Sequence, residues 1–198
     1  MLGFSATRGK SYPVFALLGL LLTNGGYSQE IHATFGIQSF DKEFAFASAP
    51  QFGLGVGHDI THGLQLNLSL VMTPTQQRIS AATQPVEHKV TVVHYALGIR
   101  LSRSVPRVRP LRVFAQAAFG GLIFRSGGLR LELQPGTAVY LAPRSDHRFG
   151  FALGGGLRVP LRAPLALLLE YRGVWHHAPA LGRTVRHDYL GTGLALRL

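Results

Sequence analysis

The chain has 198 residues, a length that suggests one domain, and carries 46% hydrophobic but only 15% charged residues, with a net charge of +11. It contains no cysteine, which excludes a disulfide scaffold, thiolate zinc sites, iron–sulfur ligation and a cysteine nucleophile. The apolar fraction is too high for a disordered chain. The low charge and the 24 glycines are unusual for a water-soluble globular protein.

The first 28 residues have the pattern of a secretory signal peptide. Two basic residues precede an apolar run over residues 14–22, and small residues up to Ser28 offer a cleavage site. A membrane-spanning helix needs about 20 apolar residues, so this run is too short to be an anchor. We therefore predict a cleaved signal peptide over 1–28 and a single exported domain over 29–198.

After residue 30 the chain alternates apolar and polar residues with a period of two, which is typical of β-strands. The clearest segment sets four leucines and Met72 against Gln65, Asn67 and Ser69. Eight such segments follow one another without a linker, at about 31–40, 52–60, 64–73, 93–101, 112–124, 149–159, 165–175 and 189–198.

The connections between these segments alternate in length. Long polar connections at 41–50, 74–89, 125–147 and 176–187 alternate with shorter ones that carry Gly or Pro, at 61–63, 102–110 and 160–164. Only 102–110 is longer than a tight turn requires. This layout predicts an all-β fold, an eight-stranded antiparallel up-and-down barrel with loops at one end and turns at the other, as in outer-membrane barrels.

Alternation alone is also compatible with a soluble, secreted, lipocalin-like barrel that carries an apolar ligand. The polar faces, however, consist of glycine, alanine, amides and isolated arginines, which suit a narrow eight-stranded interior better than a water-facing surface. The apolar faces carry aromatic residues toward the strand ends, as in interfacial girdles: Phe40, Phe52, Phe149 and Trp175. These features favour a transmembrane β-barrel, with the soluble barrel as the alternative.

The last segment places Gly193, Leu196 and Leu198 at the spacing of a C-terminal assembly signal, with leucine in place of the terminal aromatic residue. In this feature and in its strand pattern the chain resembles the small OmpA/OmpX-type outer-membrane β-barrels, also called the porin family. The resemblance implies a Gram-negative outer-membrane protein that contacts outer-membrane lipids and the barrel-assembly machinery. It also implies a structural or interaction role in membrane integrity, adhesion or ligand contact by extracellular loops, and we expect a monomer.

Inside such a barrel, the polar face of the seventh segment carries Glu170 and Arg172. A buried carboxylate is costly unless it is paired, so we expect Glu170 to meet Arg172, Arg148 or Arg158. A network of this kind would plug the lumen and leave no large pore.

Arginines also concentrate at the turn end: Arg100, Arg103, Arg107, Arg109, Arg112, Arg158, Arg162 and Arg197. We predict that they form a basic periplasmic ring that binds anionic phospholipid head groups or another acidic surface. Solvated arginines at strand ends are the alternative. A nucleic-acid partner is not expected, because these residues neither lie on one helix nor alternate with stacking aromatics.

The sequence predicts no catalytic residue, cofactor or metal site. The histidines near the connections (His58, His62, His176, His177 and His187) lack a zinc-site spacing. A lipid-acting outer-membrane hydrolase is a further alternative, but Ser145, Asp146 and His147 are too close in sequence to converge from one strand end. No G-x-S-x-G elbow or dinucleotide-binding glycine motif is present.

Overall fold

The computed structural model describes residues 29–80, 85–106, 108, 110–134 and 137–198, so the predicted signal peptide lies outside the described residues. Eight strands form the barrel: β1 Gln29–Ser39, β2 Ala49–Thr61, β3 Leu64–Ser80, β4 Pro85–Ser104, β5 Arg112–Ser126, β8 Arg144–Pro160, β9 Leu165–Ala178 and β10 Arg183–Arg197. Four short elements lie in the connections: the 3-10 helices η1 Lys42–Phe44 and η2 Pro179–Leu181, and strands β6 Leu129–Gln134 and β7 Thr137–Leu141. Within the described part of the chain, no helix is long and apolar enough to cross a membrane.

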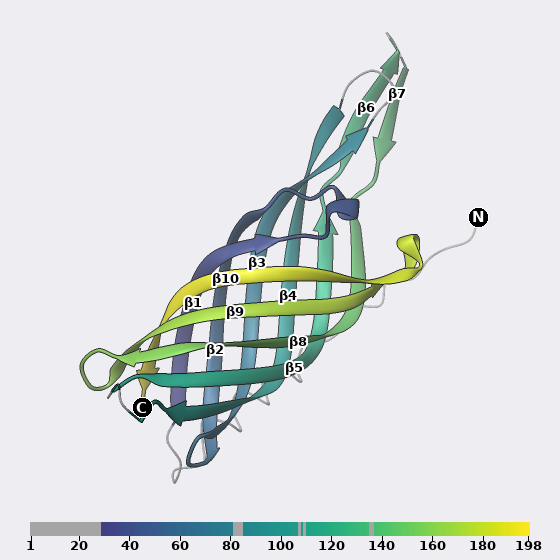
Figure 1. Ribbon diagram of the computed structural model, residues 1–198. Helices are drawn as coiled ribbons and strands as arrows, with labels where there is room; N and C mark the ends of the chain where they lie inside the picture. Colours follow the sequence, from purple (N-terminus) through teal and green to yellow (C-terminus); the bar gives the residue numbers. More distant parts are fainter. Residues whose placement is uncertain (1–28, 81–84, 107, 109, 135–136) are drawn as a thin grey trace, which may run out of the picture.

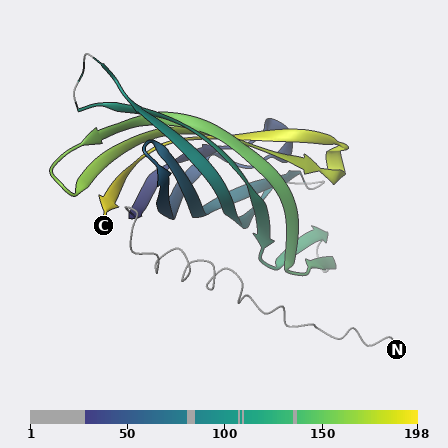
Figure 2. The ribbon, with the colours of Figure 1, turned by 90° about the horizontal axis from the view of Figure 1, so that it is seen from below.

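The eight strands pair antiparallel and close into a barrel in the order β1-β10-β9-β8-β5-β4-β3-β2. The end of β10 lies beside the start of β1, where Glu30 pairs in register with Arg197 (Figures 1 and 2). Closure gives every strand two neighbours, so no strand edge is left without hydrogen-bond partners. The predicted eight-stranded antiparallel barrel is confirmed.

The apolar face of each strand points outward. In β3, Leu70 and Met72 are 54% and 51% exposed, whereas Gln65, Asn67 and Val71 are buried inside. A soluble lipocalin-like barrel needs the reverse arrangement, with its aliphatic row lining the interior. The observed orientation therefore argues against that alternative.

The interior is narrow, and small residues make room for large ones. Gly55 on β2 faces His32 on β1, and a Cβ atom at this glycine would overlap the imidazole ring. Gly63 has a φ of +94°, which lets the two-residue turn between β2 and β3 close.

The strands extend further at the loop end than the sequence pattern predicts. β3 and β4 pair as far as Ser80 and Pro85, across most of the predicted 74–89 connection. Strands β6 and β7 form a separate hairpin inside the predicted 125–147 loop, which projects from this end of the barrel (Figure 1). Side chains support the β3–β4 extension as well, through the Arg78–Glu87 ion pair and the hydrogen bond that Gln77 donates to the carbonyl of Phe44. The signal for the hairpin was present in the sequence, where Leu129, Leu131 and Leu133 alternate with polar residues ahead of a Pro-Gly pair.

One predicted girdle residue was placed wrongly. Phe52 and Phe149 are exposed on the outer surface, and Trp175 stacks on the outward-facing Phe151 with ring centroids 5.2 Å apart. Phe40 instead packs inside the loop end, against the rings of Phe46 and His187. It follows the last residue of β1, where the chain turns inward and the strand alternation no longer applies.

The outward aliphatic row gives a direct test of lipid contact. Leu68 on β3 pairs in register with Val56 and Leu97, in the middle of the apolar band. Leu68→Arg should lower the free energy of unfolding in lipid vesicles by about 2–4 kcal/mol, because it places a charge near the middle of the bilayer. The same change at Gln76, on the same face of β3 but nearer the loop end, should cost less than about 1 kcal/mol. Equal costs in a urea titration would show that the row does not lie in lipid.

Candidate functional site

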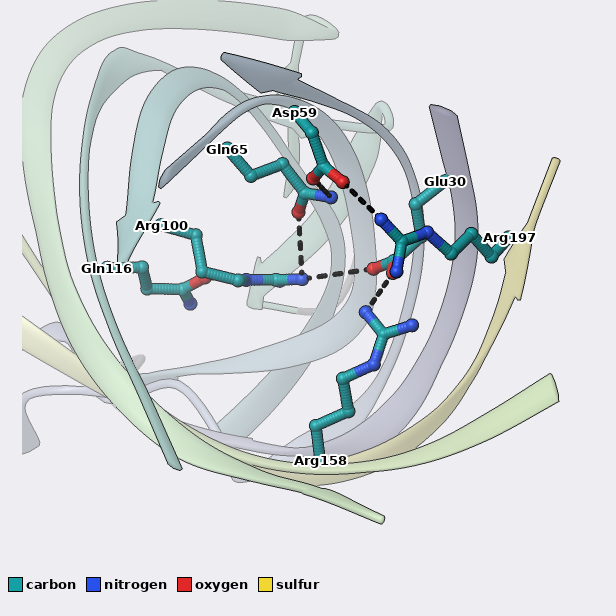
Figure 3. Close-up of polar contacts among 7 residues, drawn as sticks. All are labelled: Glu30, Asp59, Gln65, Arg100, Gln116, Arg158 and Arg197. Atoms are coloured by element: carbon teal, nitrogen blue, oxygen red, sulfur yellow. Dashed lines mark hydrogen bonds and ion pairs between the residues drawn. The ribbon is translucent and has the colours of Figure 1, made fainter. Parts of the chain in front are cut away.

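A buried carboxylate organises the turn end of the lumen. Glu30 on β1 is 2% exposed and lies between two arginines that reach it from other strands (Figure 3). Arg100 on β4 donates from Nη1 to Glu30 Oε1 at 3.3 Å, and Arg158 on β8 donates to Glu30 Oε2. These contacts link strands across the barrel that are not neighbours in the sheet.

The network continues toward the middle of the barrel. Arg100 also donates to the amide oxygens of Gln65 and Gln116, and Gln116 donates from its amide to Glu170. Arg172 lies 3.7 Å from Glu170, measured from Nε to Oε1. The cavity beside these groups is about 30 Å³, which leaves room for very few water molecules. Side chains therefore fill this part of the lumen.

The structure brings together some of the predicted lumen residues and separates others. Glu170 meets Arg172, one of its three predicted partners. Arg158 pairs with Glu30 instead, and Arg148 pairs with Asp146 at 2.6 Å. The sequence pattern does not single out Glu30 as the hub, because it lies at the very start of β1, before the alternation that marks the first strand. Glu30 lies two residues before the buried His32, and side chains two residues apart on a strand point to the same face. Continuing the alternation back to Glu30 would have indicated that it faces inward.

The predicted basic ring is divided between the lumen and the rim. Arg100 and Arg158 were predicted to lie on the rim, but they lie inside the barrel. The reason is that the even-numbered residues of β4 and β8 face the lumen. Arg112 and Arg197 stand at the mouth, where Arg197 pairs with Asp59 at 2.7 Å. Two further members, Arg103 and Arg162, are exposed at this end, and the remaining two, Arg107 and Arg109, lie outside the described residues.

The loop after β1 folds over the loop end of the lumen. Its phenylalanines pack against inward-facing rings of β5, β9 and β10; the cluster consists of Phe40, Phe44, Phe46, Phe124, His176 and His187. The backbone N–H of Asp41 donates to His187 Nδ1 at 3.3 Å. Arg183 joins the loop to β10 through Glu43 at 2.9 Å. The hydrogen bond to Glu43 raises the pKa of the Arg183 guanidinium.

The groups considered for catalysis do not converge. Asp146 faces inward and accepts hydrogen bonds from Arg148, whereas its neighbours Ser145 and His147 are exposed on the opposite face of β8. His176 and His187 contact each other, with 2.8 Å between their Nε2 atoms. Among the described residues, no group of three or more His, Asp or Glu side chains is placed to hold a metal ion.

Known structures share this architecture. The computed structure superposes on Neisserial surface protein A with a TM-score of 0.56 at 13% sequence identity, over 87% of this chain and 97% of that one. A major outer membrane protein from Thermus thermophilus also gives 0.56 at 13% identity, over 87% and 100% of the two chains. Pseudomonas aeruginosa OprG gives 0.55 at 9% identity, over 87% and 96%. The chain has the fold of the small eight-stranded outer-membrane β-barrels.

The similarity to these proteins is limited to the fold, because the sequence matches no family model and no curated protein. Of the predicted assembly-signal residues, Gly193 and Leu196 lie on the closing strand β10 and Leu198 directly follows it. Gly193 and Leu196 on β10 pair in register with Thr34 and Ile31 on β1. Leu198 donates its backbone N–H to the carbonyl of Gln29 at 2.8 Å.

Breaking the buried ion pairs of Glu30 should lower the free energy of unfolding more than breaking an exposed ion pair does. Glu30→Gln leaves the buried Arg100 and the partly buried Arg158 without their carboxylate, which should cost about 3–5 kcal/mol of unfolding free energy. Glu87→Gln breaks the exposed pair with Arg78 and should cost about 1 kcal/mol or less. Urea titrations of the refolded variants compare the two, and similar costs would show that Glu30 does not hold the lumen together.

Proposed function

We propose that the protein is an outer-membrane β-barrel of the Gram-negative cell envelope, exported through a signal peptide over residues 1–28. The observation that carries this proposal is the orientation of the strands, with aliphatic side chains outside and the charged network enclosed. Water would solvate the reverse arrangement, and only an apolar solvent stabilises this one. The proteins that share the fold are outer-membrane proteins, which supports the proposed location.

The proposed role is structural or interaction-based, in membrane integrity, adhesion or ligand contact. The aromatic cluster at the loop end, the network around Glu170 and the hub at Glu30 succeed one another along the lumen and support a closed barrel without a large pore. At the extracellular end, the β6–β7 hairpin presents Tyr140 at 67% exposure and Val139 at 40%. This hairpin is our candidate for the segment that contacts a partner.

No enzymatic role is proposed, because the inward Asp146 is separated from the outward Ser145 and His147. Insertion would depend on the barrel-assembly machinery, for which Gly193, Leu196 and Leu198 are the proposed signal. We propose a monomer that contacts outer-membrane lipids around its whole outer face.

Membrane location is tested by fractionation and by gel migration. The protein should partition into the detergent-extracted envelope and migrate differently on a denaturing gel before and after boiling, because closed barrels stay folded in detergent at room temperature. Recovery from the soluble fraction, with identical migration of boiled and unboiled samples, would overturn the proposal.

A barrel with a closed lumen should not conduct ions across a membrane. Purified protein in planar bilayers should give no sustained porin-like current, because side chains fill the interior from the aromatic cluster to Glu30. A sixteen-stranded porin inserted under the same conditions serves as the positive control. Steady large conductance steps from this protein would contradict the closed lumen.

A further inference from the structure

A hollow of about 740 Å³ lies at the turn end of the barrel, between the β4–β5 and β8–β9 turns. Its walls combine apolar residues of both turns with three arginines. The apolar part includes Val105, Leu111, Pro164 and Leu165, and the cations are Arg112, Arg158 and Arg197. The same three arginines line a smaller cavity of about 40 Å³ that leads to Glu30 and Asp59.

The charges at this end do not balance among the described residues. Four arginines of the inner face, Arg100, Arg112, Arg158 and Arg197, meet only two carboxylates there. Glu30 is shared by Arg100 and Arg158, and Asp59 pairs with Arg197. In the part of the chain that the structure describes, Arg112 forms no ion pair with a carboxylate. The hollow is thus cationic and has an unneutralised guanidinium on its wall.

We infer that this hollow binds the head group of an anionic phospholipid from the periplasmic leaflet, with Arg112 as the principal contact to its phosphodiester. The inference rests on the proposed membrane location and deepens it. Guanidinium groups bind phosphate oxygens through paired, charge-assisted hydrogen bonds, so Arg112 has the chemistry that the head group requires.

The apolar wall selects a lipid over a free anion. Leu165 lines the hollow and also begins the outward, lipid-facing row of β9, with Leu169 further along it. An acyl chain attached to a head group near Arg112 can therefore continue along this row within the bilayer. A small soluble anion would leave the walls formed by Val105 and Leu111 in contact with water.

The experiment uses the full chain refolded in non-ionic detergent at low salt, titrated calorimetrically with dihexanoylphosphatidylglycerol. We expect saturable binding that is much weaker for dihexanoylphosphatidylcholine and for glycerol phosphate. Arg112→Gln should weaken binding of the anionic lipid by about tenfold or more, because it removes a charge-assisted contact. Val105→Glu should weaken it as well, by placing a competing carboxylate in the hollow.

The matched control is Arg162→Gln, which removes the same charge from the β8–β9 turn at a residue that does not line the hollow. It should retain the affinity of the unmodified protein. Equal weakening by Arg162→Gln and Arg112→Gln, unchanged affinity in both hollow variants, or equally tight binding of glycerol phosphate would each overturn the inference. Heat-modifiable migration of every variant is measured in parallel, so that loss of the barrel itself is distinguished from loss of this site.

Discussion

Closure of the sheet is the constraint on which the rest of this structure depends. A backbone in lipid must satisfy all of its polar groups internally, and a closed antiparallel barrel does so without an edge. Because side chains alternate along a strand, closure also places each side chain of the barrel either on the outer surface or in the lumen. The aliphatic row that contains Leu68 then faces outward, while its neighbours Asn67 and Ser69 face the lumen.

The narrow lumen encloses several charged side chains, among them Glu30, Arg100 and Glu170. The arginines that reach Glu30 come from strands on other parts of the wall, so the ion pairs brace the barrel across its interior (Figure 3). Buried ion pairs add little net stability over apolar packing but are costly to break singly. The excess of arginine at the turn end gives that mouth of the barrel its cationic character.

Two-residue periodicity and the alternating connection lengths were sufficient to predict the eight barrel strands and their antiparallel order. The outward face followed from the glycine, alanine, amide and isolated arginine residues of the polar faces. The partners of individual charges were not predictable in the same way. Glu170 and Arg172 lie two residues apart on one strand, so their pairing follows from the strand alone. The pairing of Glu30 with Arg158 depends on how the sheet closes, over a separation of 128 residues. The β6–β7 hairpin was included in the predicted 125–147 loop, although residues 129–134 alternate apolar and polar side chains as a strand does.

The most direct test of the account is the environment of Trp175, the single tryptophan of the chain, which stacks on Phe151 on the outer face of the barrel. Its fluorescence can be measured in the unmodified protein reconstituted into vesicles of brominated phospholipid. We expect strong quenching by bromine on the acyl chains and weak quenching by aqueous iodide. Strong quenching by iodide, with none by the brominated lipid, would contradict it.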